Sequence, residues 1–265
     1  MTMQDRRAEA FRTLHAGPPF VMPNPWDAGS ARVFEALGFR ALATTSSGFA
    51  FTLGRLDGRT TLDDVAAHVE MLSRITALPV SADLENGYGA EPASAARAVT
   101  HIASAGAVGG SIEDWDSAQH RLYDRLHAVE RVTAAVEAAR ALPFSFTLTA
   151  RTENHIRGNP DLDDTITRLH AFEQAGADVL YAPGLTTLEQ IRTVCAALSK
   201  PVNVLARPDF SFDQLVEAGA KRVSVGGALA WVAARAMADA AIAIRDHGDF
   251  SALSARVPLV DWFRS

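Results

Sequence analysis

The stretch Asp83-Leu84-Glu85 places two carboxylates two residues apart, directly after the apolar run Val80–Ala82 and before the turn Gly87-Tyr88-Gly89. Residues i and i+2 of a strand point to the same face, so the two acids should lie side by side. Neighbouring carboxylates raise each other's pKa unless a cation lies between them. Mg²⁺, or Mn²⁺ in its place, prefers oxygen ligands of this kind. The motif therefore predicts a metal site at a strand end; the plain alternative is a solvated strand end before a turn.

Length and composition narrow the class of protein. The chain has 265 residues, of which 48% are hydrophobic and 21% charged, enough for a large core in a single domain. The net charge of −6 and the lack of a long basic run give no indication of a nucleic-acid or membrane partner. The first ten residues are polar, no run is long enough to span a membrane, and Cys195 is the single cysteine. We expect a cytoplasmic protein without an intrachain disulfide.

Eight short β-type runs alternate with helical patterns along the chain. The predicted strands are Phe20–Asn24, Ala41–Ser47, Val80–Leu84, Gly106–Glu113, Phe144–Thr152, Asp178–Ala182, Val202–Ala206 and Arg222–Gly226. The predicted helices are Ala28–Leu37, Leu62–Ile75, Pro92–Ala105, Val129–Ala141, Asp163–Ala175, Thr187–Leu198, Phe212–Ala218 and Ala228–Arg245, with Asp27, Thr61 and Thr186 as N-terminal caps.

Strict β/α alternation calls for a parallel sheet, and eight units call for a closed (β/α)8 TIM barrel. An open, doubly wound sheet is the alternative, but its glycine-rich dinucleotide fingerprint is absent. We expect one domain over residues 1–265, with a C-terminal extension from about residue 246.

Other predicted strands also end in polar residues. Since the carboxyl ends of barrel strands form the face that carries enzyme chemistry, these residues should meet Asp83 and Glu85 there. They comprise Ser47-Gly48-Phe49, Glu113-Asp114-Trp115, Arg151-Thr152-Glu153-Asn154, Asn203 and Arg207. Any one of them could be an ordinary surface residue or an internal ion pair; their convergence on one rim indicates a site.

At these residues the chain resembles the isocitrate lyase/phosphoenolpyruvate mutase superfamily, from Pro23 to about Gly227. The most specific match is the stretch 83–89, which follows the family's acid-x-acid-x-Gly-Tyr-Gly motif. Supporting matches are Ser47-Gly48, Leu56-Asp57-Gly58, Ile112-Glu113-Asp114, Ala150-Arg151-Thr152 and Pro201-Val202-Asn203-Val204. The resemblance implies a (β/α)8 barrel that forms a homotetramer by exchanging its eighth helices, here Ala228–Arg245.

The resemblance also implies roles for single residues. Asp83 would bind Mg²⁺ directly, while Asp57, Glu85 and Glu113 would hold it largely through water. Backbone N–H groups around Ser47, Gly48 and Phe49 would bind substrate oxygens. Arg151 would clamp a carboxylate with both arms of its guanidinium, and Asn203 would contact the far end of the substrate. The shared chemistry is an α-oxycarboxylate that passes through an enolate or a similar anion.

The segment after Glu113-Asp114 departs from the family. Members that cleave isocitrate carry Lys-Lys-Cys-Gly-His there, whereas this chain has Trp115-Asp116-Ser117-Ala118-Gln119-His120. Cys195 lies in a helical pattern and is expected to be a packed thiol. The polar, aperiodic segment Asp116–His127 suits a mobile lid, whose candidate proton donors are His120 and Tyr123; either could be an ordinary loop residue.

The sequence thus predicts a Mg²⁺-dependent enzyme that acts on a small α-keto or α-hydroxy carboxylate. The expected reaction is C–C bond cleavage, by a lyase or decarboxylase, through an enolate of an oxaloacetate-like acid. One alternative is P–C chemistry of the phosphonomutase or phosphonopyruvate hydrolase kind. Another is a metabolite-binding protein that kept the metal site without an effective lid.

Overall fold

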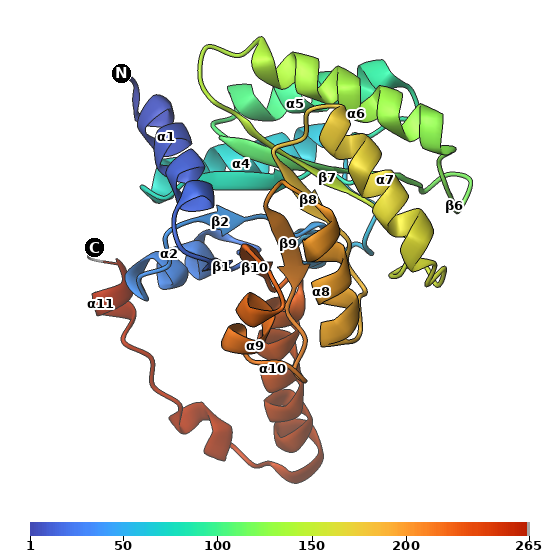
Figure 1. The fold of residues 1–265 in the computed structure, drawn as a ribbon. Helices are drawn as coiled ribbons and strands as arrows, with labels where there is room; N and C mark the ends of the chain where they lie inside the picture. The colour runs from blue at the N-terminus through green and yellow to red at the C-terminus, as the bar shows by residue number, and fades with distance from the viewer. Residues whose placement is uncertain (264–265) are drawn as a thin grey trace.

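Eight parallel strands surround the centre of the molecule in the computed structural model, which describes residues 1–263 (Figure 1). Their order is β1-β10-β9-β8-β7-β4-β3-β2. Their bounds are Phe20–Met22 (β1), Leu42–Ala43 (β2), Val80–Asp83 (β3), Gly109–Glu113 (β4), Thr147–Arg151 (β7), Val179–Tyr181 (β8), Val202–Leu205 (β9) and Arg222–Ser224 (β10).

The two ends of this sheet meet. The backbone N–H of Ala43 donates to Pro23 O over 3.1 Å, and the amide of Asn24 donates to Thr44 O over 3.0 Å. The oxygen of the same side-chain amide, Asn24 Oδ1, accepts hydrogen bonds from the backbone N–H groups of Val225 and Gly226. Asn24 therefore joins β1 to both of its neighbours, and the predicted (β/α)8 barrel is confirmed.

Each predicted helix is present around the barrel. The helices are Ala28–Ala36 (α2), Leu62–Ile75 (α4), Pro92–Ser104 (α5), Arg125–Arg140 (α6), Leu162–Gln174 (α7), Leu188–Ala197 (α8), Phe212–Glu217 (α9) and Ala228–His247 (α10). Asp27 and Thr61 cap α2 and α4 as predicted, whereas the cap of α8 is Thr187 rather than Thr186. Apolar side chains of these helices pack against the sheet in two large clusters.

The N-terminal helix Met3–Ala16 (α1) has no counterpart among the predicted elements. Its Phe11 is fully buried and packs with Phe20, Met22 and Val108. This approach needs a glycine on β4, because a Cβ on Gly109 would lie 2.8 Å from the Phe11 ring and 2.9 Å from Thr147 O.

The second predicted strand, Ala41–Ser47, is wrong in its second half. Strand β2 ends at Ala43, and Ser46–Thr52 forms helix α3. The side chain of Thr45 accepts from Gly48 N and so caps this helix. A short polar side chain that can satisfy a free N–H here favours a helix start over a longer strand.

The predicted lid contains regular structure. Trp115–Asp116 (β5) and Arg121–Leu122 (β6) pair as an antiparallel hairpin, and α6 starts at Arg125, four residues before the predicted Val129. The side chain of Asp116 accepts from Ala118 N and Gln119 N, which shapes the hairpin turn.

Helix α10 projects from the barrel, and the chain beyond it returns so that Leu259–Phe263 (α11) lies beside α2 (Figure 1). All twenty residues of α10 are described, and of these only Ala230 is buried. Its exposed apolar side chains include Trp231, Val232, Met237 and Ile242. Within residues 1–263, no helix is long and apolar enough to cross a membrane.

Candidate active site

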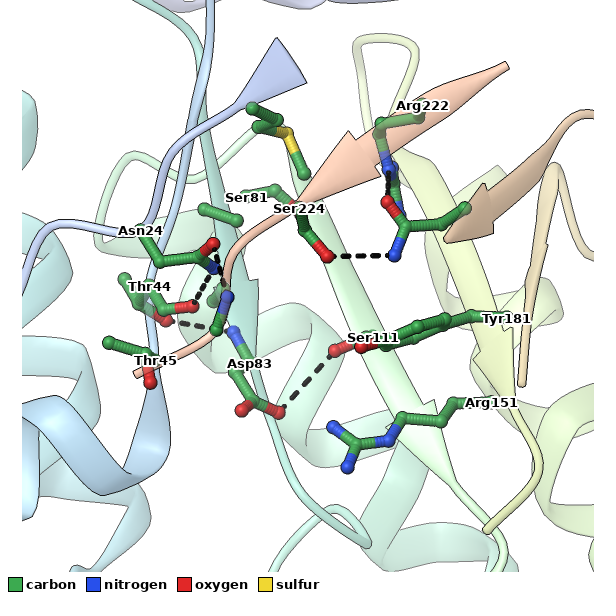
Figure 2. A pocket seen from close by; sticks show the side chains of 15 residues that line it. Asn24, Thr44, Thr45, Ser81, Asp83, Ser111, Arg151, Tyr181, Arg222 and Ser224 are labelled. Atoms are coloured by element: carbon green, nitrogen blue, oxygen red, sulfur yellow. Dashed lines mark hydrogen bonds between the residues drawn. The ribbon is translucent and has the colours of Figure 1, made fainter. Parts of the chain in front are cut away.

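A small cavity that opens to solvent lies inside the barrel (Figure 2). Most of its lining side chains are polar and uncharged, such as Asn24, Thr44 and Ser81. The charged exceptions among the lining residues are Asp83, Arg151 and Arg222. A polar interior of this kind can bind a small anion through many hydrogen bonds.

Asp83, the last residue of β3, is held in place by hydrogen bonds to its backbone and to its carboxylate. Its own N–H donates to Thr44 Oγ1 over 2.8 Å. Its carboxylate accepts from Ser46 N over 3.3 Å, from Glu85 N over 3.3 Å and from Ser111 Oγ over 3.5 Å. These bonds fix the carboxylate at the cavity wall, where it can contact a bound ion or ligand.

Glu85 lies in the turn after β3 in a left-handed conformation, with φ of 48°. Thr60 and Tyr88 each donate a 3.4 Å bond to its Oε1. Burial, together with the nearby charges of Asp83 and Asp57, raises the pKa of Glu85 to about 7. Asp57 and Asp83 thus both repel a charge on Glu85, which is the electrostatic situation that a divalent ion relieves.

This donor set fits a hard metal ion held mainly through water. No group of three or more His, Cys, Asp or Glu side chains within the described chain is arranged to ligate a metal directly. Mg²⁺ commonly takes one or two carboxylates and keeps several waters, so it requires no such group. Asp83 can supply the direct oxygen, with Glu85, Asp57 and Glu113 as partners of the waters.

A cluster of two glutamates and two arginines stands beside Asp83. Arg151 Nε donates to Glu153 Oε1 and lies 3.5 Å from Glu113 Oε2. Arg157 donates to Glu153 over 2.8 Å and lies 3.5 Å from Glu113. Burial raises the pKa of Glu113, while the two arginines oppose this rise. For Arg151, burial is outweighed by Glu153 and Glu113, which hold its pKa above the usual range.

Glu153 belongs to the polar end of the fifth predicted strand, but no individual role was predicted for it. It is fully buried, and its backbone N–H donates to the buried carboxylate of Asp114 over 2.9 Å. It follows Arg151 by two residues, so the same i, i+2 rule that singled out Asp83 and Glu85 could have indicated it.

Arg151 is the charged group best placed to receive a ligand. Its Nε is already bonded, and no described residue takes a hydrogen bond from its two terminal nitrogens. Its central carbon lies 5.3 Å from the centroid of the Tyr181 ring. Figure 2 shows the guanidinium directed across the cavity toward Asp83.

The residues Ser47, Gly48 and Phe49 lie in the first turns of α3 rather than on a strand. A side chain at Gly48 would meet Thr45 Cγ2 at 2.6 Å and Trp26 Cβ at 3.2 Å, so this turn requires glycine. The Phe49 N–H is used within the helix, bonding Thr45 O over 2.9 Å. Its ring stacks on His68, with 4.1 Å between centroids, so Phe49 contributes packing beneath the site.

Asn203 lines the inner part of the cavity from β9. Its Nδ2 donates to Ser224 Oγ over 2.9 Å, and its Oδ1 accepts from Arg222 Nε over 2.8 Å. Arg222 and Tyr181, which also line the cavity, were not among the predicted site residues; their strands gave no motif that separates them from core residues.

The two candidate proton donors lie outside the cavity lining. His120 is exposed at the hairpin turn, in a left-handed conformation with φ of 51°. Tyr123 is buried; its hydroxyl accepts from Asn86 Nδ2 over 3.0 Å, and the Arg131 guanidinium lies 4.5 Å from its ring centroid. The hairpin is also tied to the charged cluster, since Arg157 lies 4.7 Å from the ring centroid of Trp115.

Cys195 is half-buried on α8, and burial raises the pKa of its thiol to about 12. A Cβ on Gly219 would lie 2.6 Å from the Cys195 Cβ, so the thiol packs against the turn that follows α9. A thiol with a raised pKa stays protonated near neutral pH, whereas a catalytic cysteine needs to be a thiolate.

Comparison with known proteins agrees with this geometry. Residues 11–245 match the family model described as phosphoenolpyruvate phosphomutase. An oxaloacetate decarboxylase from Rhodopseudomonas palustris (strain TIE-1) is 31% identical, over 96% of this chain and 90% of that protein. A crystal structure from Burkholderia cenocepacia J2315, to which a lyase or mutase activity has been ascribed, is 51% identical with a TM-score of 0.96, covering 99% of this chain and 97% of that one. Oxaloacetate acetylhydrolase with its product oxalate is 28% identical with a TM-score of 0.87, covering 96% of this chain and 93% of that one.

Proposed function

Because the chain belongs to the phosphoenolpyruvate phosphomutase family of the phosphoenolpyruvate mutase/isocitrate lyase superfamily, we propose that it is a Mg²⁺-dependent carbon–carbon lyase. Its substrate is a small α-keto or α-hydroxy dicarboxylate such as oxaloacetate. The observation that carries the proposal is the placement of Arg151 and Asp83 on one polar cavity, with the terminal nitrogens of Arg151 free for a carboxylate.

The residues of this chain would bind and orient the substrate. Arg151 pairs with one carboxylate through its terminal nitrogens, while Glu153 holds its Nε and so fixes the plane of the guanidinium. The start of α3 lies beside Asp83, because the Ser46 N–H donates to that carboxylate, and the N–H group of Ser47 would contact a substrate oxygen there. Asn203 contacts the far end of the substrate from the inner wall.

Bond cleavage leaves the electron pair of the broken C–C bond on the remaining fragment as an enolate, which a proton then quenches. When bound near Asp83, Mg²⁺ supplies the positive charge that stabilises an oxyanion of this kind. The proposed proton donors are His120 and Tyr123 in the segment 116–127. Both lie outside the cavity lining here, so the hairpin would have to close over the ligand for either to act.

Two relatives support the choice of substrate class. The oxaloacetate decarboxylase that matches 96% of this chain and the acetylhydrolase crystallised with oxalate both act on the same four-carbon keto diacid, by their names. We further propose a homotetramer in which α10 packs on a neighbouring subunit, because that helix is apolar and almost wholly exposed in one chain.

Turnover of a panel of acids tests the proposal. Oxaloacetate, malate derivatives and phosphonopyruvate are each incubated with the purified protein, with Mg²⁺ and with a chelator. We expect Mg²⁺-dependent cleavage of an oxaloacetate-like acid. Turnover of phosphonopyruvate alone would favour P–C chemistry, and tight oxalate binding without turnover of any acid would favour a metabolite-binding protein.

A further inference from the structure

Arg222 is a buried guanidinium for which the proposed reaction has no role. It is the first residue of β10, it is 3% exposed, and it lines the cavity. Figure 2 shows it at the end of the cavity away from Asp83 and Arg151. It forms the floor of the cavity, beneath the proposed substrate.

Every hydrogen-bond partner of Arg222 is uncharged. Its Nε donates to Asn203 Oδ1 over 2.8 Å, its Nη2 donates to Thr149 Oγ1 over 2.9 Å, and its Nη1 lies 3.2 Å from His15 Nε2. No carboxylate of the described chain pairs with it. A buried cation without an acidic partner is costly, so such a residue needs an explanation.

His15 is a neutral acceptor for Arg222 and adds no second positive charge beside it. Its Nδ1 lies 2.8 Å from Phe11 O, which requires a proton on Nδ1 and leaves Nε2 as the acceptor for Arg222. Burial and the neighbouring Arg222 lower the pKa of His15 to about 3, so the ring is neutral. The positive charge of Arg222 thus lies at the floor of the cavity without an acidic partner among the described residues.

The donors of Arg222 also fix the orientation of Asn203. A guanidinium only donates, so the amide must turn its oxygen toward Arg222 and its NH₂ group toward Ser224 and the cavity. We propose that Arg222 is a positioning residue that holds the Asn203 NH₂ toward the substrate and makes the inner end of the cavity selective for a carboxylate or carbonyl oxygen. This inference rests on the proposed function, because it assigns the second acidic end of the substrate to the Asn203 side.

The substitution Asn203→Asp separates this role from a structural one. The aspartate keeps an oxygen toward Arg222 and forms a buried ion pair, so we expect the melting temperature to stay equal or to rise. The other oxygen replaces the NH₂ donor and repels an acid, so oxalate affinity should fall about tenfold or more. Both are measured with saturating Mg²⁺, by thermal unfolding and calorimetry, after the Mg²⁺ affinity of the variant has been determined alone.

A double-mutant cycle of oxalate binding for Arg222 and Asn203, together with a matched control variant, completes the test. Arg222→Met should weaken oxalate binding about tenfold in the wild-type background and cause no further loss when Asn203 is already Leu. Thr149→Val removes another partner of Arg222 without touching Asn203, and it should leave oxalate affinity within about twofold.

The outcomes are distinguishable. If Asn203→Asp binds oxalate as tightly as the wild type, or if the two losses in the cycle add, the positioning role is overturned while the proposed function stands. If the wild-type protein binds neither oxalate nor any acid of the turnover panel, the proposed function fails, and the positioning role fails with it.

Discussion

Glu153 accepts hydrogen bonds from the Nε atoms of both Arg151 and Arg157. The carboxylate is fully buried, whereas the Arg151 side chain is 15% exposed and the Arg157 side chain 38% exposed. One acid thus anchors the inner edge of each guanidinium and leaves the outer edge of Arg151 facing the cavity. The protein therefore binds Arg151 through its Nε atom, and the two terminal nitrogens stay available to a ligand.

The substitution Arg151→Lys should therefore change binding more than folding. Lysine keeps the positive charge beside Glu113 and Glu153 but cannot present two parallel donors. We expect a small change in melting temperature and about a tenfold or larger loss of oxalate affinity, measured by calorimetry with Mg²⁺. Arg140→Lys is the control, because Arg140 pairs with Asp178 away from the cavity. A lysine variant at 151 that binds oxalate normally but melts much lower would identify Arg151 as a structural residue.

Replacement of Asp83 should remove the stabilisation of the fold by Mg²⁺. An ion that binds only the folded chain, at a hundred times its dissociation constant, stabilises that chain by about 2.7 kcal/mol. We expect this gain in thermal unfolding for the wild type and its loss in Asp83→Ala. Asp63→Ala serves as the control, since the Asp63 side chain is 91% exposed and pairs with His101. Equal Mg²⁺ affinity of Asp83→Ala and the wild type in calorimetry would contradict the assignment.

Protonation of His68 should lower the stability of the protein in acid, whereas protonation of Glu85, whose pKa burial raises to about 7, opposes that loss. Burial lowers the pKa of His68 to about 4, the residue is 4% exposed, and its Nε2 is buried without a hydrogen-bond partner. In the unfolded chain its pKa is near 6.5, so the unfolded state binds more protons and stability falls as pH drops from 6.5 toward 4. This group alone contributes a loss of about 2 kcal/mol between pH 7 and pH 5.

Chemical unfolding at pH 7 and pH 5 measures this loss in the wild type and in His68→Leu. The free energy of unfolding of the variant, taken relative to the wild type, should be about 2 kcal/mol higher at pH 5 than at pH 7. His247→Gln, at the exposed end of α10, should leave the difference between the two pH values unchanged. An unaltered difference in His68→Leu would mean that other groups cause the acid sensitivity.

Light scattering tests the proposed tetramer. The chain has a mass of 28.3 kDa, and we expect a particle of four chains at micromolar concentration. The substitutions Val232→Glu and Met237→Glu place charges on side chains that are 65% and 62% exposed in one chain. They should leave a single chain folded and break up the assembly. A wild-type monomer would contradict the exchange of α10.

The barrel was predictable because each strand and helix carries a local signal. The short apolar runs of the strands, capping residues such as Asp27 and Thr61, and the β/α alternation are all present in the structure. The elements that were predicted wrongly or missed are those whose structure depends on a single side chain. Thr45 caps a helix inside a run that reads as a strand, and Phe11 docks α1 through a contact with Gly109 that no local pattern encodes.

The candidate site divides in the same way. Asp83, Glu85 and Arg151 stand out because their types and positions at strand ends are unusual for a core. The role of Glu153 as a partner of two arginines and the surroundings of Arg222 depend on which residues meet in the fold, in the case of Arg222 and His15 across 207 residues of sequence. From the sequence alone one cannot see that Arg222 is buried without a carboxylate partner among the described residues.

The closure of the sheet between β1 and β2 has a consequence for the synthesis of the chain. Strand β1 is made early, yet it pairs with β10 through Phe20 and Arg222, about 200 residues later. At a translation rate of roughly 5–20 residues per second, the edge of β1 waits about 10–40 s for its partner on the ribosome. Asn24, which bonds both Thr44 and the Val225-Gly226 backbone, can complete its contacts only at that final step. Nascent chains that stop before β10 should therefore be the preferred clients of chaperones that shield unpaired strands.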